Sequence, residues 1–137
     1  MERQQKKQTF QHDPRALYQD HFVSVRPDCL VIKQYFIPSM LPFEIPWDQL
    51  ESLVYNPQIQ EDKTKVRDKG MDEEGRWWAT DVLRAHEREL RLYNVRIEAD
   101  CEPRKSGFTV IHIDQFLKAC RPLIPYSCHL SGCVWSE

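Results

Sequence analysis

The fold of this chain is decided by the stretch Leu30-Val-Ile-Lys-Gln-Tyr-Phe-Ile-Pro-Ser-Met-Leu-Pro-Phe-Glu-Ile-Pro-Trp-Asp-Gln-Leu-Glu-Ser-Leu-Val-Tyr55. The stretch is strongly apolar, yet it contains three prolines and no glycine. Proline interrupts a helix and cannot donate a hydrogen bond within a sheet, so the prolines mark the ends of short strands. Side-chain alternation predicts strands over 30–37 and 43–47, joined by a loop over 38–42 that begins and ends with proline.

Further strands are predicted on both sides of this stretch. Residues 22–26 are apolar and β-branched, and Pro-Asp at 27–28 supplies a turn, which predicts a hairpin with the strand at 30–37. Residues 89–98 and 108–113 show the same alternation of side chains. Short strands joined by turns are typical of an antiparallel, mostly β domain.

One helix is predicted near the C-terminal end. From Ile113 the apolar residues recur at helical spacing, and Pro122 ends the pattern. We therefore expect one mostly β domain over residues 21–124, capped by this single C-terminal helix. Residues 1–20 are expected to form a flexible arm, and residues 125–137 are expected to form a tail.

Composition limits the class of protein. The chain has 137 residues, 41% hydrophobic and 29% charged, which is typical of a globular domain. A formal net charge of −2 leaves no basic excess for nucleic acid, and four glycines argue against phosphate-binding glycine loops. We find no membrane-spanning run and no apolar signal core, and therefore expect a cytoplasmic protein. The mixed charges of 61–76 predict a solvated loop.

These elements resemble a pleckstrin-homology-like (PH-like) domain of the bacterial and GRAM types. In that family two strands precede an Ile-Pro-x-x-x-Ile-x-Ser-Val turn, and Ile45-Pro46 with Leu50-Glu-Ser-Leu53 fill comparable places. The ending Gly107-Phe-Thr-Val-Ile-His-Ile-Asp-Gln-Phe-Leu-Lys-Ala119 resembles the last strand and capping helix of the family. The resemblance covers about residues 21–124 and implies an antiparallel β-barrel or sandwich with a helix closing one end.

The resemblance also implies a kind of function. Members of the family almost always bind a partner, which is a phosphoinositide, a peptide, a small G protein or another copy. Lipid-binding members carry basic residues around the first hairpin, and here that region offers Arg26 and Lys33. Two cations rarely hold a multiply charged head group, so protein binding is the favoured interpretation.

Aromatic side chains are the candidate contacts with a protein. Trp77 and Trp78 are neighbours in a predicted strand, so one is expected to enter the core and the other to face outward. With Tyr93 or Tyr35, the outward ring would form an aromatic patch of the kind found at interface hot spots. A core that uses both tryptophans is the other interpretation. The groove between a strand and the helix is an alternative site, where an extended segment would add as a further strand.

The C-terminal part of the chain raises a metal hypothesis. Cys120, Cys128, His129 and Cys133 offer thiolate and imidazole groups, which zinc prefers as ligands. However, the sequence has no paired Cys-x-x-Cys motif, and a tail with ordinary free thiols explains the same residues. We therefore predict no metal and no cofactor, with a small metal-binding protein as an alternative.

A hydrolytic site is the other chemical alternative. It would combine Cys29 with His86 or His112 and with an acid such as Asp81 or Asp114. Cys29 begins an apolar strand, however, where a buried and inert thiol is the usual explanation. We therefore predict that the protein is not an enzyme.

Taken together, the sequence predicts a non-enzymatic binding or scaffolding module that recognises a protein partner or itself. A peripheral module for anionic membrane lipid is the alternative, and nucleic acid is not an expected partner. The lipid alternative requires Lys63, Lys65 and Arg67 to converge with the two cations of the first hairpin. The candidate binding residues are Trp77, Trp78, Tyr93, Tyr35, Lys33 and Arg26.

Overall fold

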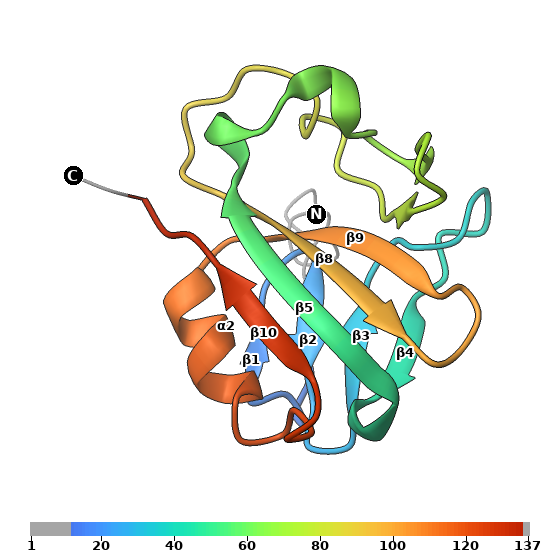
Figure 1. The fold of residues 1–137 in the computed structure, drawn as a ribbon, viewed down its shortest axis with the longest axis vertical. Coiled ribbons are helices and arrows are strands. Elements are labelled where there is room, and N and C mark those ends of the chain that lie inside the picture. The colour runs from blue at the N-terminus through green and yellow to red at the C-terminus, as the bar shows by residue number, and fades with distance from the viewer. Residues whose placement is uncertain (1–11, 136–137) are drawn as a thin grey trace, which may run out of the picture.

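The structure is a computed structural model that describes residues 12–135. In this part of the chain two β-sheets pack together with one α-helix, α2 (Figure 1). The first sheet has the strand order β1-β2-β3-β4 and is antiparallel throughout. Its strands are β1 (Tyr18–Gln19), β2 (Val23–Val25), β3 (Cys29–Ile32) and β4 (Phe43–Pro46).

The second sheet has the strand order β10-β5-β8-β9-β7-β6. The central ladder of β5, β8 and β9 is antiparallel, whereas β10 joins β5 in parallel and β7 joins β9 in parallel. The strands are β5 (Leu50–Pro57), β6 (Gly70–Met71), β7 (Trp77–Trp78), β8 (Tyr93–Ala99), β9 (Lys105–Val110) and β10 (His129–Gly132).

The long connection from β5 to β8 gathers at one end of the second sheet, as the green-to-yellow ribbon of Figure 1 shows. It carries β6, β7 and the short 3-10 helices η2 (Gln58–Gln60) and η3 (Lys63–Lys65). A third short helix, η1 (Trp47–Gln49), leads from β4 into β5. We call the residues between β5 and β8, 58–92, the β5–β8 connection.

Helix α2 (Ile113–Cys120) covers the core that lies between the sheets. Its apolar residues Ile113, Phe116, Leu117 and Cys120 are buried, because they recur on one face of the helix. The ring of Phe116 lies 5.9 Å from that of Tyr18 and 6.2 Å from that of Phe108, measured between centroids. None of the helices in residues 12–135 is both long enough and apolar enough to cross a membrane.

The mostly β fold with one C-terminal helix is confirmed for the described residues. Their hydrogen bonds define two separate sheets and no closed barrel. The strand predicted over 30–37 ends at Ile32, because the chain turns at Gln34, which has a positive φ of 54°. The strand predicted over 89–98 begins only at Tyr93.

Regular structure extends beyond the expected limits of the domain. β1 belongs to the segment expected to be an arm, and β10 belongs to the expected tail. Residues 1–11 of the arm lie outside the described residues. The charged segment 61–76 is not a wholly solvated loop, because Val66 and Arg76 are buried within it. The sequence therefore underestimated how much of the chain packs on the sheets.

The close packing of Gly107 against Trp78 gives a first test of the fold. An added Cβ at Gly107 would lie 2.5 Å from Cζ3 of the Trp78 ring. Gly107→Ala is therefore expected to lower the free energy of unfolding by about 1–3 kcal/mol, measured by urea unfolding. Lys105→Ala, at an exposed position of the same strand, is the control and should change it by less than about 0.5 kcal/mol. Equal effects of the two variants would contradict this packing.

Candidate functional site

The loop between β3 and β4 exposes a group of large apolar side chains. Phe36, Ile37, Met40 and Leu41 all remain exposed, and Leu41 presents 61% of its surface. Met71 of β6, which is 57% exposed, adds a fifth apolar side chain. We call these five residues the apolar platform. A cluster of exposed apolar side chains on a folded domain often marks an interaction site.

The loop of the platform is held in one conformation by its own backbone. The amides of Tyr35 and Phe36 donate to the carbonyl of Leu41 at 3.2 and 3.1 Å, and the Met40 amide donates to the carbonyl of Phe36. Gln34 and Met40 adopt positive φ values of 54° and 62°, although neither is glycine. Strained backbone of this kind costs on the order of 1–3 kcal/mol and clusters at functional sites. The loop is thus preorganised, which lowers the entropy cost of binding.

Strand β7 fixes this loop to the second sheet. The indole Nε1 of Trp77 donates to the carbonyl of Tyr35 at 2.7 Å, and the amide of Thr80 donates to the carbonyl of Gln34 at 2.9 Å. Met71 is the cross-strand partner of Trp77, so both side chains lie on the same face of the sheet. The loop and β6 are therefore linked through Trp77.

Acidic residues border the platform. Asp72, Glu73 and Glu74 follow Met71 directly, and the side chains of Glu73 and Glu74 are exposed. Lys69, two residues before Met71, offsets one of these three charges. The loop between β3 and β4 carries no charged residue from position 34 to 42. The hollow that Met71 lines also contains Arg104 and Lys105, but its four acids, Glu51, Glu74, Glu98 and Glu102, outnumber them, so the border of the platform at Met71 carries an excess of negative charge.

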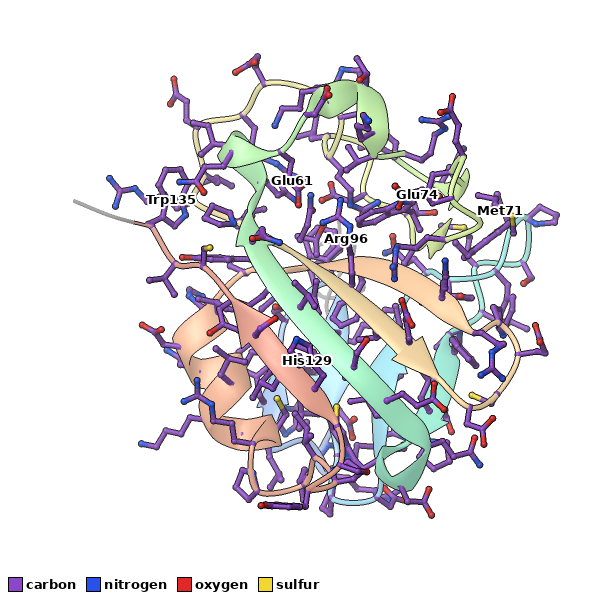
Figure 2. All side chains as sticks on the ribbon, viewed as in Figure 1. Glu61, Met71, Glu74, Arg96, His129 and Trp135 are labelled. Atoms are coloured by element: carbon purple, nitrogen blue, oxygen red, sulfur yellow. The ribbon has the colours of Figure 1, made fainter. Side chains whose placement is uncertain are left out.

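Trp78 anchors β7 beneath the β5–β8 connection. Its side chain is fully buried, and the guanidinium carbons of Arg84 and Arg96 lie 4.8 and 5.1 Å from the ring centroid. The indole Nε1 donates to a carboxylate oxygen of Asp72 at 2.9 Å. Arg96 is itself held by Glu61 through two hydrogen bonds of 2.6 and 3.1 Å (Figure 2). Desolvated cation–π contacts contribute about 2 kcal/mol or more, so this cluster stabilises the base of the platform.

A buried polar network ties the same connection to β9. Asp81 accepts hydrogen bonds from Thr109, at 2.6 Å, and from Arg88. Arg84 donates to Thr109 at 3.1 Å and to the carbonyl of Ala79 at 2.8 Å. Desolvation raises the pKa of Asp81, but the hydrogen bond from Thr109 and the charges of Arg84 and Arg88 outweigh it and lower the pKa. The carboxylate is therefore kept ionised in a buried position.

The predicted patch of exposed aromatic residues is wrong. Tyr35, Trp78 and Tyr93 expose only 1%, 0% and 4% of their surfaces. Trp77 is partly buried, with its ring centroid 6.2 Å from that of Tyr35. The prediction failed because both tryptophans have packing partners, Trp77 on the core face and Trp78 under the β5–β8 connection. Of the four aromatics, Trp77 and Tyr35 adjoin the platform, and the ring centroid of Tyr35 lies 4.8 Å from that of Phe36.

The residues of the platform were missed by the sequence analysis, although a signal exists for two of them, Met40 and Leu41. Pro38 and Pro42 keep the intervening residues out of the sheet. In a strand, neighbouring apolar side chains alternate between core and solvent, whereas residues of a loop outside the sheet have no core face. Apolar residues between two such prolines are thus candidates for a surface contact.

The cations of the lipid hypothesis do not converge in the described residues. Arg26 and Lys33 line a common hollow of about 390 Å³ on the first sheet. Arg26 pairs with Asp13 at 2.8 Å and with Glu44 at 3.7 Å, and Lys33 donates to a backbone carbonyl at 2.8 Å. Desolvation raises the pKa of Asp13, but hydrogen bonds from Arg26 and a serine outweigh it and lower the pKa to about 2. The other three cations of the lipid hypothesis, Lys63, Lys65 and Arg67, do not line this hollow.

The metal hypothesis finds no assembled site in the part of the chain that the structure describes, and burial affects the thiols of both the metal and the hydrolytic hypotheses. No group of three or more His, Cys, Asp or Glu side chains is placed there to hold a metal ion. Cys120 is fully buried, and burial raises the pKa of its thiol to about 12. Burial also raises the pKa of the Cys29 thiol, which disfavours the nucleophilic thiolate. His86 contacts Asp68, at 2.9 Å.

Comparisons of the chain with models of known protein families, with curated proteins and with solved structures gave no match. The features of the molecule that bear on function are therefore the apolar platform, its charged border and the contacts that hold it. These features favour binding, because they present a fixed apolar surface to the solvent.

The lowered pKa of Asp81 predicts how stability depends on pH. Such a carboxylate contributes stability above its unfolded pKa of about 3.9 and loses that contribution as the pH falls through the folded value. We expect the free energy of unfolding to fall between about pH 5 and pH 2, and to fall less steeply in Asp81→Asn. Urea unfolding at a series of pH values measures both slopes. Parallel curves for the variant and the wild type would show that Asp81 is not the group responsible.

Proposed function

We propose that the chain is a non-enzymatic protein-binding module that engages its partner through the apolar platform. One observation carries the proposal: a preorganised loop exposes four large apolar side chains, and β6, which is linked to this loop through Trp77, exposes a fifth. Removing such surface from water contributes about 25 cal/mol per Å² of apolar area. In an isolated monomer these exposed side chains contribute no hydrophobic free energy to folding, so a partner that buries them would explain why they are held at the surface.

A PH-like scaffold is part of this proposal. Strands β1 to β9 precede α2, as the resemblance implies, whereas β10 follows the helix and joins the second sheet. A scaffold of this kind presents its loops on a rigid frame, and binding residues occur disproportionately on such loops. The β3–β4 loop fits that arrangement, because β7 and its own hydrogen bonds hold it in place.

The charge around the platform favours a protein over an anionic membrane. Membrane attraction contributes about 1 kcal/mol for each cation near the surface, whereas Glu73 and Glu74 border this platform. The same two acids would oppose each other if two platforms met face to face, which argues against self-association through this surface. The favoured partner is therefore a different protein, with an apolar groove bordered by basic residues.

Substitutions in the platform test the proposal. Leu41→Asp and Ile37→Asp should abolish retention of partner proteins by the immobilised chain, because they place a charge where the partner buries apolar surface. Both positions are exposed, so the free energy of unfolding should change by less than about 0.5 kcal/mol. Leu90→Asp, at a residue that is 65% exposed outside the platform, is the matched control and should retain the same proteins as the wild type.

A vesicle assay separates the two kinds of partner. The wild type is sedimented with vesicles of anionic lipid, and we expect it to remain in the supernatant because the border of the platform is acidic. Pelleting that Leu41→Asp abolishes would replace the protein partner with a membrane surface. Identical protein retention by Leu41→Asp and Leu90→Asp would remove the platform as the contact.

A further inference from the structure

The C-terminal strand β10 covers the free edge of β5. The two strands run in parallel, with Leu130 opposite Leu53 and Gly132 opposite Tyr55. The amide of Cys133 then donates to the carbonyl of Tyr55 at 2.9 Å. Figure 1 shows β10 between β5 and α2. The groove between strand and helix, which the sequence suggested for an added strand, is thus occupied by the chain's own C-terminal segment.

The docking of this segment is incomplete. All four side-chain positions of β10 are exposed or only partly buried. Two hollows, of about 480 and 360 Å³, lie between the segment and α2, and Val134 lines both of them. Among residues 12–135, the Nε1 of Trp135 is buried with no hydrogen-bond partner, and an unsatisfied buried donor of this kind costs about 1–3 kcal/mol. The segment is therefore held less firmly than the strands of the core.

The contacts that hold the segment require particular residue types at two of its positions. A Cβ at position 132 would lie 2.5 Å from Cγ of Tyr55, so the edge accepts only a residue without a side chain there. Three residues later, the Trp135 amide donates to the hydroxyl of Tyr93 at 2.8 Å, and the guanidinium of Arg91 lies 4.9 Å from the indole centroid. Figure 2 shows where Trp135 lies beyond the end of β10. The edge thus fits Gly-x-x-aromatic, a pattern that this chain itself supplies.

The turn before β10 is the segment that would have to straighten if β10 left its own β5. It spans Pro125–Cys128, and its amide-to-carbonyl hydrogen bond joins those two residues at 2.9 Å. Tyr126 and Ser127 within the turn are exposed. Straightening the turn would carry β10 and its Leu130 away from the chain's own β5, while β5, β8 and β9 would stay paired with one another.

We infer that the β5 edge is a self-association site, at which the C-terminal segment of one copy replaces that of a second copy. Reciprocal exchange reproduces every β10–β5 contact in a closed pair of copies. An uncovered strand edge is prone to pair with other chains, so each edge remains covered in the monomer and in the pair. The partner of this surface is thus a second copy, whereas the platform serves a different protein.

A labelled peptide tests the exchange. The probe is fluorescein-labelled Ser-Ser-His-Leu-Ser-Gly-Ser-Val-Trp, which is residues 127–135 with serine in place of both cysteines, and binding to the full chain is followed by anisotropy. In the wild type, the tethered strand competes at an effective concentration near the mM range. In Gly132→Val the tethered strand clashes with Tyr55, so the peptide should bind at least about tenfold more tightly than to the wild type.

Two controls make the peptide result specific. Ser131→Val places the same side chain one position earlier in β10, where the strand pattern accommodates it, and should bind the peptide as weakly as the wild type. A probe carrying valine in place of its glycine should bind neither protein. The exchange is overturned if folded Gly132→Val does not bind the probe, or if the valine probe binds equally well.

A second measurement uses only the wild-type protein, so it tests the inference even if Gly132→Val fails to fold. Sedimentation velocity under reducing conditions, over an about hundredfold range of concentration, should show a dimer whose fraction rises with concentration. An excess of the glycine probe should dissociate this dimer, and the valine probe should not. A monomer at all concentrations, or a dimer that the glycine probe leaves intact, would overturn the inference.

Discussion

The burial of Trp78 beneath the β5–β8 connection is the contact on which the candidate site depends. Its ring lies against Arg84 and Arg96, its indole nitrogen binds Asp72, and Gly107 leaves the space that it fills. Because neighbouring strand residues face opposite sides, fixing Trp78 also fixes Trp77 on the other face. Trp77 then holds the β3–β4 loop by its hydrogen bond to a loop carbonyl. The position of the platform is thus set by a ring that never reaches the surface.

Two buried arginines of the irregular β5–β8 connection donate hydrogen bonds to backbone carbonyls, both within the connection and in the neighbouring strands β8 and β9. Arg84 donates to the carbonyls of Arg67 and Ala79 at 2.8 Å, and Arg76 donates to the carbonyls of Ile97 and Ser106 at 2.9 Å. Buried carbonyl groups need such partners, and a segment with short strands leaves many of them without a ladder. Desolvating a guanidinium is costly, but its several donors satisfy several carbonyls at once. The connection is consequently fixed by buried arginines as well as by the buried ring of Trp78.

Local patterns in the sequence predicted the elements whose neighbours are close in the chain. The hairpin after residue 22 and the helix after Ile113 follow from periods of 2.0 and 3.6, which a short window reveals. Strand β10 was missed because His-Leu-Ser-Gly has no such pattern and becomes a strand only through the edge of β5. The burial of Arg76 was missed for a similar reason, since a charged residue predicts solvent until distant carbonyls are known. The site depended on these long-range contacts, so its residues were predicted less well than the fold.

The two surfaces lie at opposite ends of the second sheet, which has important consequences for binding. Its strand order begins at β10 and ends at β6, the strand that contributes Met71 to the platform. Exchange of β10 between two copies therefore leaves both platforms open, and the pair presents two binding surfaces at once. A partner with two matching grooves would then gain up to about 10²–10⁴ in avidity without any new contact, provided that its spacing suits the pair. Exchange of β10 at the edge of β5 would in this way raise the affinity with which the platforms, at the opposite end of the sheet, bind such a partner.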